Sequence, residues 1–392
     1  SVGMPQQMPG EPHRCFGLFD DAICFIGESK KIFEESVNKL HGFEKDVYET
    51  TSRKWFIDRI MEIVTPRILE GSTLTNAEGS EAIDALSRVP NSKFHLFREI
   101  KGISFSPKSD PLRLGVFTIY SVVNHHHILQ MRSSVSLEQA LDHECPEFLI
   151  EVCTYAREPI KALELADIAF GGFEQVLRFM IGQRTEVYEV GILNYTGRNL
   201  LRAWQIEDKI INYNSAVKGT HETVSIDEPY FVSAEKGFDK LWALLAEPSP
   251  TPIQRRILMA VSWFSQSLYE KNLSSAFIKA AVAIELLFKS DKKAIITPSI
   301  MSQICEGTCL LLFDGVEERI HAEKRLKDAY GLRSAIVHSG SERVDHDSYR
   351  YIMMISRMLI ITLLTDPRLA SFSRLEEIGD YIKRVKYSGK AI

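Results

Sequence analysis

The feature that most constrains the fold is a change of hydrophobic patterning at Ala246–Arg256. This stretch, AEPSPTPIQRR, contains three prolines and a serine, which favour a turn or linker. After it there is almost no strand pattern, and apolar residues recur at helical spacing in segments with short connections. The sequence therefore predicts a separate domain of five or six helices, a helical bundle, over residues 251–392.

The expected helices of this bundle are Ile257–Glu270, Ser275–Phe288, Pro298–Phe313, Val316–Val337, Ser348–Leu364 and an amphipathic Arg374–Val385. In Ser275–Phe288 the apolar stripe at helical spacing consists of Phe277, Ala280, Ala281, Ile284 and Phe288. Ser274, Thr297, Asp345 and Asp347 stand where residues that cap helix amino termini are expected. Gly340 stands where a helix that contains Val337 should stop.

The sequence pattern of residues 1–250 predicts a mixed α+β region. The expected elements are helices at Lys30–Leu40, Ser52–Leu69, Arg157–Ile181 and Ala234–Ala246, and strands at Ser92–Phe105, Leu112–Val123, Thr185–Tyr195 and His221–Val232. Gly171 and Gly172 are a possible break in the third helix. The expected fold class is thus an α+β region followed by an all-α bundle.

The cysteine content and the hydropathy pattern favour a cytoplasmic protein. Six cysteines in 392 residues are too sparse for a disulfide framework, and we expect them to be reduced and packed as small hydrophobic residues. No apolar run reaches the length that crosses a bilayer, which is about 20 residues. The polar stretch Ser1–Pro12 does not resemble a signal peptide, so we expect neither export nor a membrane partner.

Charge is unevenly distributed along the chain. The net charge is −5 overall, with 26 Lys+Arg against 36 Asp+Glu in residues 1–250 and 21 against 16 in residues 251–392. The two parts therefore carry −10 and +5. The whole chain is not a basic nucleic-acid binder, but a phosphate-bearing ligand would suit the carboxy-terminal part. A chance asymmetry of solvated faces explains the difference equally well.

Three other clusters could carry chemistry, and for each a structural role is the stronger interpretation. The three histidines of Asn124–His127 point to different sides of an extended chain, which favours a surface turn. Asp142–Cys145 and Cys153 offer metal ligands, but at a spacing that matches no known motif. Gly171-Gly172 lacks the lysine and hydroxyl residue of a phosphate-binding loop.

The fourth cluster lies in YGLRSAIVHSG, residues 330–340, where Arg333 and His338 are separated by four residues. In an ideal helix this spacing places them about 140° apart around the axis, on different faces. They converge within one chain only if His338 lies beyond the last regular turn, as the nearby Gly340 suggests. Otherwise, the two residues meet across a partner chain.

An arginine and a histidine suit the cleavage of RNA by its own 2′-hydroxyl group. Arginine binds phosphate through two hydrogen bonds and stabilises the charge of the transition state. Histidine moves protons near neutral pH. The reaction needs neither a metal ion nor a bound water nucleophile. The alternative is structural, because an arginine and a histidine at a helix end can simply cap carbonyl groups.

The carboxy-terminal 140 or so residues resemble a HEPN domain, the higher-eukaryote and prokaryote nucleotide-binding helical bundle. They are most similar to the ApeA-like branch of bacterial anti-phage proteins. Three segments carry the resemblance: SSAFIKAAVAIELLF at Ser274–Phe288, LKDAYGLRSAIVHSG at Leu326–Gly340 and YRYIMMISRMLIITLL at Tyr349–Leu364. The R-x4-H motif alone recurs by chance, whereas its combination with the flanking helices is considerably more specific.

The resemblance implies a metal-independent endoribonuclease without a cofactor, which acts as a homodimer with one composite site. In that site Arg333 would bind phosphate and His338 would be the acid/base. Ser334 stands where many family members have Asn, Asp or His, which puts a strong polar role there in doubt. Glu285 matches an acidic position of the early helix, and we expect it to orient Arg333 through an ion pair, because an unpaired buried carboxylate is costly.

The expected function is a toxin-like ribonuclease in anti-phage defence, with RNA as the substrate. By analogy alone, residues 1–250 would be a sensor or regulatory region that responds to a phage trigger or a regulatory partner. One alternative is a non-catalytic HEPN module that binds nucleotides or RNA, or only dimerises. Another is a bundle that dimerises an amino-terminal enzyme, although residues 1–250 contain no recognisable catalytic set.

Overall fold

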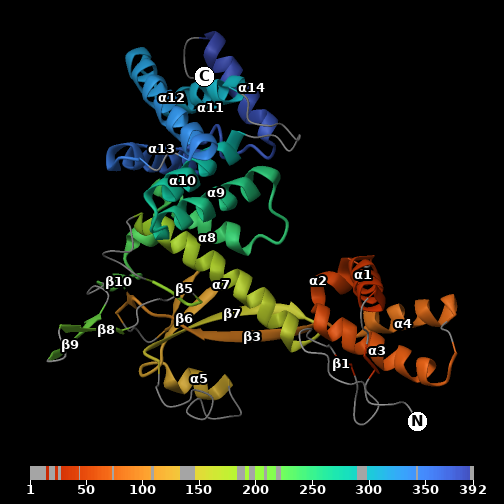
Figure 1. Cartoon of the computed structure of the whole chain (residues 1–392). Helices are drawn as coiled ribbons and strands as arrows, with labels where there is room; N and C mark the ends of the chain where they lie inside the picture. The colour runs from red at the N-terminus through yellow and green to blue at the C-terminus, as the bar shows by residue number, and fades with distance from the viewer. Residues whose placement is uncertain are drawn as a thin grey trace. The chain divides into compact units, whose positions relative to one another are not determined.

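A computed structural model describes most of the chain (Figure 1). The described residues are 15–16, 23–24, 28–43, 45–72, 75–106, 110–132, 146–182, 190–193, 199–206, 210–217, 222–288, 298–340 and 343–388. Up to residue 250 they form both helices and strands, and from residue 251 onward they form helices only. The predicted order of an α+β region followed by helices is therefore confirmed at this coarse level.

The chain divides into two compact units. The first contains Ser1–Leu96 and Cys153–Ile168, and the second contains Phe97–Val152 and Ala169–Ile392. The predicted boundary between residues 250 and 251 lies within the second unit, in the connection between two helices. The carboxy-terminal helices therefore share a compact unit with residues 97–152 and 169–250.

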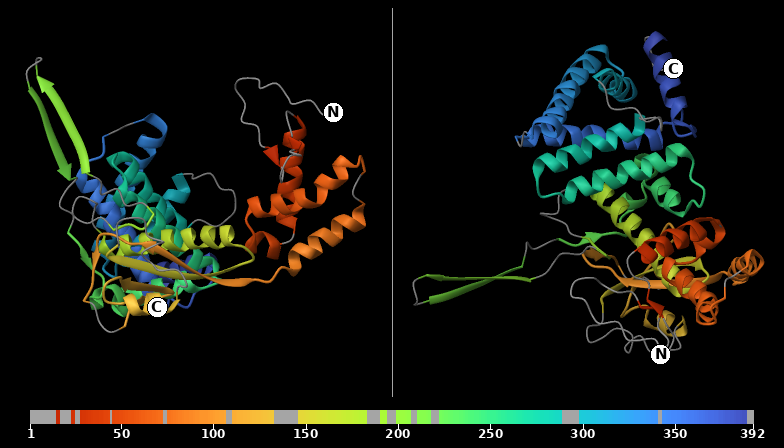
Figure 2. Two further views of the ribbon diagram at one scale, coloured as in Figure 1. Left: turned by 90° about the horizontal axis from the view of Figure 1, so that it is seen from below. Right: turned by 45° about the vertical axis from the view of Figure 1, so that its right-hand side comes forward.

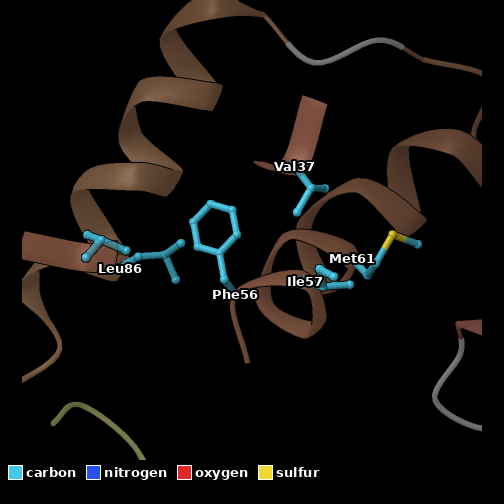
Figure 3. Packing of buried hydrophobic residues seen from close by; sticks show 6 residues of the cluster. Val37, Phe56, Ile57, Met61 and Leu86 are labelled. Carbon is cyan, nitrogen blue, oxygen red and sulfur yellow. The ribbon is translucent and has the colours of Figure 1, made fainter. Parts of the chain in front are cut away.

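Four of the described helices lie entirely in the first unit: α1 (Glu28–Phe43), α2 (Lys45–Thr50), α3 (Arg53–Leu69) and α4 (Asn76–Arg88). Their buried residues form one cluster, which Figure 3 shows; its members are Val37, Val47, Phe56, Ile57, Met61 and Leu86. Ser52 caps α3, because its side chain accepts a hydrogen bond from the backbone N–H of Trp55. The predicted helices at 30–40 and 52–69 are confirmed, whereas α4 was not predicted. A short antiparallel pair, β1 (Cys15–Phe16) and β2 (Ile23–Cys24), precedes them.

A four-stranded sheet has the order β3-β7-β6-β5. Its strands are β3 (Ser92–Glu99), β5 (Leu112–Leu114), β6 (Phe117–Ser121) and β7 (Phe148–Ala156). The predicted strand over 112–123 is a hairpin, β5 antiparallel to β6, that turns at Gly115. Gly115 has a φ of 59°, and a Cβ there would lie 2.8 Å from the carbonyl oxygen of Trp242, so glycine is required. Strand β7, antiparallel to β6, was not predicted.

Helix α7 (Pro159–Ile181) confirms the long predicted helix and continues through Gly171 and Gly172 without a break. The predicted strand at 221–232 is wrong for most of its length. Only β10 (Val224–Ser225) is extended there, parallel to β4 (Ile103–Ser104), and a 3-10 helix, η2 (Pro229–Val232), follows. Most of the strand predicted at 185–195 lies outside the described residues.

The remaining elements before residue 250 are helical, apart from one hairpin. β8 (Asn199–Ile206) and β9 (Ile210–Val217) pair in antiparallel register. The helix predicted at 234–246 consists of a 3-10 turn, η3 (Ala234–Lys236), and α8 (Phe238–Ala246). A short helix, α5 (His126–Arg132), follows β6. Among the residues that the structure describes, no helix is both long enough and apolar enough to cross a membrane.

Among the described residues after the proline-rich connection there are six helices, which agrees with the predicted five or six. Figure 2 shows this helical part in two further views. The six helices are α9 (Pro252–Tyr269), α10 (Leu273–Phe288), α11 (Pro298–Leu312), α12 (Val316–Ser339), α13 (His346–Thr365) and α14 (Leu375–Ser388). Asp345 caps α13, since its side chain accepts from the N–H of Ser348 at 2.7 Å. The predicted cap at Ser274 is wrong: this residue lies inside α10, and Asn272 Oδ1 accepts from the N–H of Ser275 instead. Thr297 is outside the described residues.

Candidate functional site

An ion pair links α10 to α12 at the centre of the candidate site. Arg333 Nε lies 3.2 Å from Glu285 Oε1, and their side chains are only 16% and 7% exposed. The Nη2 group of Arg333 also donates to Glu285 Oε2, at 3.5 Å. Glu285 lies in an apolar helix, where an uncompensated carboxylate would be costly, and the guanidinium supplies the compensating charge. The predicted ion pair is therefore confirmed.

Tyr330 completes the buried surroundings of this pair. It lies one turn before Arg333 on α12, is 2% exposed, and its hydroxyl donates to the carbonyl oxygen of Ala281 at 3.5 Å. Burial, and secondarily the charge of Glu285, holds the pKa of the Tyr330 hydroxyl well above its ordinary value. Tyr330 consequently remains a neutral hydrogen-bond donor, and its hydroxyl donates to the backbone of α10.

Helix α13 fixes the position of α12 from another side. The Tyr351 hydroxyl donates to the carbonyl oxygen of Ala322 at 3.1 Å, and the guanidinium carbon of Arg325 lies 4.1 Å from the centre of the Tyr351 ring. A cation over an aromatic face adds roughly 0.5–2 kcal/mol. Because α12 is held by both α10 and α13, the direction in which Arg333 leaves the helix is determined by packing.

His338 lies inside α12, in its last turn, and its side chain is exposed. The helix continues to Ser339 and ends at Gly340, which adopts the left-handed conformation with φ 64°. The expectation that His338 lies beyond the last regular turn is therefore wrong. Since Arg333 and His338 belong to one regular helix, they are about 140° apart around its axis. Within one chain they lie on different faces of α12.

Ser334 lies on the side of α12 that carries His338. The two residues are four positions apart, which corresponds to about 40° around the axis. Ser334 is half-buried and His338 is exposed. The helix thus divides the motif: Arg333 contacts Glu285 on α10, while Ser334 and His338 lie on another face.

The predicted surface turn at Asn124–His127 is confirmed only in part: residues 122–125 form a turn and Asn124 is exposed, but the first histidine is buried. His125 is fully buried, and its Nδ1 accepts a hydrogen bond from the N–H of Ser121 at 3.0 Å. His126 and His127 begin α5. The histidine therefore closes the turn after β6, a role that its sequence neighbours did not indicate. The other early cluster, Asp142–Cys145, lies outside the described residues.

The three cysteines whose side chains the structure describes are of two kinds. Cys305 and Cys309 on α11 are buried, as predicted, and burial raises the pKa of each thiol to about 12. Cys153 on β7 is exposed, so the prediction of a packed small residue is wrong there. Its Sγ lies 3.3 Å from Nδ1 of His95, which brings together two side chains of metal-ligand and nucleophile type.

Comparisons of the chain with protein-family models, with curated proteins and with solved structures found no match. The chemistry of the site is therefore argued from its own residues. A guanidinium repels cations and binds phosphate, so the Arg333 side of α12 suits a phosphate group rather than a metal ion.

Replacing Glu285 with glutamine is expected to lower the free energy of unfolding by about 3 kcal/mol, because it leaves the largely buried Arg333 cation without its partner. Urea denaturation of the full-length protein measures the change. The matched control is Glu323→Gln, which removes an exposed i,i+4 pair with Lys327 and should change stability by less than about 0.5 kcal/mol. Equal effects of the two substitutions would mean that the Glu285–Arg333 ion pair contributes no more to stability than the Glu323–Lys327 pair.

Proposed function

We propose that the protein is a metal-independent endoribonuclease of the HEPN type. The observation that carries the proposal is the placement of Arg333, a half-buried cation held by Glu285, on the same helix as the exposed His338. The first group has the charge and geometry to bind a phosphate, and the second can exchange protons with a substrate from solvent. The resemblance of the flanking segments to HEPN sequences supports the same function.

In the proposed reaction the 2′-hydroxyl oxygen of one nucleotide attacks the adjacent phosphorus. The new P–O bond forms as the bond to the 5′-oxygen breaks, giving a 2′,3′-cyclic phosphate and a 5′-hydroxyl end. Arg333 stabilises the negative charge that accumulates on the phosphoryl oxygens. His338 transfers a proton, either from the attacking hydroxyl or to the leaving oxygen.

The helix geometry supports a composite site built from two copies of the chain. One α12 cannot direct Arg333 and His338 at the same phosphate, because they lie about 140° apart around its axis. In a symmetric homodimer, Arg333 of one protomer and His338 of its partner can face the same phosphate. The biological role that we propose is a toxin-like effector in anti-phage defence, restrained by its amino-terminal region until a phage trigger or a regulatory partner releases it.

One observation favours the second candidate function, a non-catalytic module that binds nucleotides or RNA. The guanidinium of Arg333 already faces a carboxylate, which offsets the charge that a transition state would need. Such a site could hold a ground-state phosphate without accelerating cleavage. Tight binding of RNA without cleavage under every condition would favour this function over the first.

Full-length protein is expected to cleave RNA in the presence of EDTA. Because the 2′-hydroxyl is the nucleophile, the products should carry 2′,3′-cyclic phosphate and 5′-hydroxyl ends, which mass spectrometry identifies. RNA with 2′-O-methyl groups at the cut positions should remain intact. Cleavage that requires added Mg²⁺, or that leaves 5′-phosphate ends, would contradict the proposed reaction.

A further inference from the structure

Cys153 differs from the two buried cysteines in its position on a strand. Residues along β7 alternate between the two faces of the sheet, and from residue 152 onward this alternation decides their burial. Val152 and Thr154 are buried, whereas Cys153 and Tyr155 are exposed. The Cys153 thiol is therefore placed where small molecules in solution can reach it.

The Cys153 thiol also has a base within hydrogen-bonding distance. Sγ lies 3.3 Å from Nδ1 of His95, on β3, and both side chains are exposed. A neutral imidazole accepts the thiol proton through its unprotonated nitrogen, and the resulting imidazolium stabilises the thiolate. The thiolate, rather than the thiol, is the nucleophilic form of cysteine.

We propose that Cys153 and His95 form a nucleophilic dyad, and that Cys153 is a site of covalent modification by small electrophiles, including peroxides. A third titratable group, the buried carboxylate of Glu151, lies two residues before Cys153 on β7, within 4.8 Å of the Cys153 sulfur, and accepts a hydrogen bond from the Tyr120 hydroxyl. The inference is independent of the proposed ribonuclease activity, because none of these residues belongs to the ribonuclease site. It assigns a chemical property to the first unit, for which the sequence offered no catalytic set.

The peroxide reaction balances without any further co-reactant. The Cys153 thiolate attacks one oxygen of hydrogen peroxide, so that an S–O bond forms and the O–O bond breaks. The leaving hydroxide takes the proton from the His95 imidazolium and departs as water. Sulfur is oxidised to a sulfenic acid and the peroxide is reduced. With an alkylating reagent, the thiolate displaces the leaving group and His95 gives up its proton to solvent.

A structural role explains this pair less well. A hydrogen bond between two exposed side chains stabilises a fold by about 1 kcal/mol or less, because water offers both groups equivalent partners. The other described cysteines whose side chains can be placed, Cys305 and Cys309, are protected by burial. Burial raises the pKa of both thiols to about 12, which makes them internal references for an unreactive cysteine.

The test is alkylation of the folded full-length protein by iodoacetamide, followed at each cysteine by mass spectrometry of peptides. At pH 7 the modification of Cys153 should be at least about tenfold faster than that of Cys305 and Cys309. His95→Gln should slow the reaction of Cys153 about tenfold at pH 7. The difference in the alkylation rate of Cys153 between the wild type and His95→Gln should nearly vanish at pH 10, because hydroxide then ionises the thiol and His95 is not needed as a base.

The pH dependence separates activation from a structural effect, because a variant that merely loosens the strand would change reactivity at every pH. Hydrogen peroxide followed by a dimedone trap should label Cys153 as a sulfenic acid in the wild type, and much less in His95→Gln. The proposal is overturned if the wild type and His95→Gln react equally at pH 7, or if Cys153 reacts no faster than the buried cysteines.

Discussion

Substitution of Arg333 by alanine is expected to lower the rate of RNA cleavage by about a thousandfold, because an arginine that stabilises phosphoryl charge contributes that much or more. The His338→Ala variant should lose about a hundredfold or more, the usual contribution of a general acid or base. Both rates are measured under single-turnover conditions with RNA in excess EDTA, so that the chemical step is observed rather than product release.

Helix α12 provides matched controls for both substitutions. His321 is an exposed histidine and Lys324 an exposed cation on the same helix. His321→Ala and Lys324→Ala remove an imidazole and a positive charge from positions outside the candidate site, and both variants should retain wild-type rates. If Arg333→Ala and His338→Ala cleave RNA as fast as the control variants do, the site assignment is refuted.

The Arg333 result needs a further variant, since Arg333→Ala also leaves the buried Glu285 without a partner. Arg333→Lys keeps the positive charge near Glu285 but loses the planar, two-pronged hydrogen bonding to phosphate. It should unfold at nearly the urea concentration of the wild type and still lose most of the activity. If activity instead followed stability across these variants, Arg333 would be a structural residue.

Mixing the two inactive variants is expected to restore activity. A dimer of one Arg333→Ala chain and one His338→Ala chain contains an intact His338 on the first chain and an intact Arg333 on the second. If the site takes one residue from each protomer, this mixed dimer contains one complete pair. If equal amounts of the two variants exchange subunits freely, half of the dimers are mixed. Each mixed dimer has one complete Arg333–His338 pair, where a wild-type dimer has two, so the mixture should recover about a quarter of the wild-type activity.

The two chains carry different affinity tags, and tandem purification shows that mixed dimers have formed before activity is measured. Each variant alone, at the same total concentration, provides the inactive baseline. No recovery in verified mixed dimers would show that Arg333 and His338 must belong to the same chain. A protein that remains monomeric at micromolar concentration would contradict the composite site directly.

Local patterning allowed much of the bundle to be predicted. The positions of α9, α10 and α13 follow from apolar periodicity, and the stop of α12 at Gly340 follows from the left-handed conformation that glycine adopts readily. The ion pair of Glu285 followed from one argument about charge, because a carboxylate in an apolar helix requires a partner. The helix predictions hold because each depends on neighbours within a few turns, whereas the choice of Arg333 as the partner of Glu285 came from the resemblance to HEPN sequences.

The errors have a common cause. The alternation that exposes Cys153 is masked at the start of β7, where five consecutive residues are buried, including Glu151. The turn at Gly115 depends on the close approach of Trp242, which is distant in sequence. The burial of His125 depends on a hydrogen bond that forms only when the turn after β6 closes. None of these features has a signal in the adjacent residues.

The sequence by itself determined the helical character of the described residues after 250 and the presence among them of an arginine, a histidine and an acid in an apolar helix. The tertiary structure decided which of these residues meet. It paired Arg333 with Glu285, 48 positions away, kept His338 on another face of α12, and brought Cys153 to His95, 58 positions away. Periodicity specifies which face of an element is buried, whereas the partner on the opposite side is selected only when the elements pack.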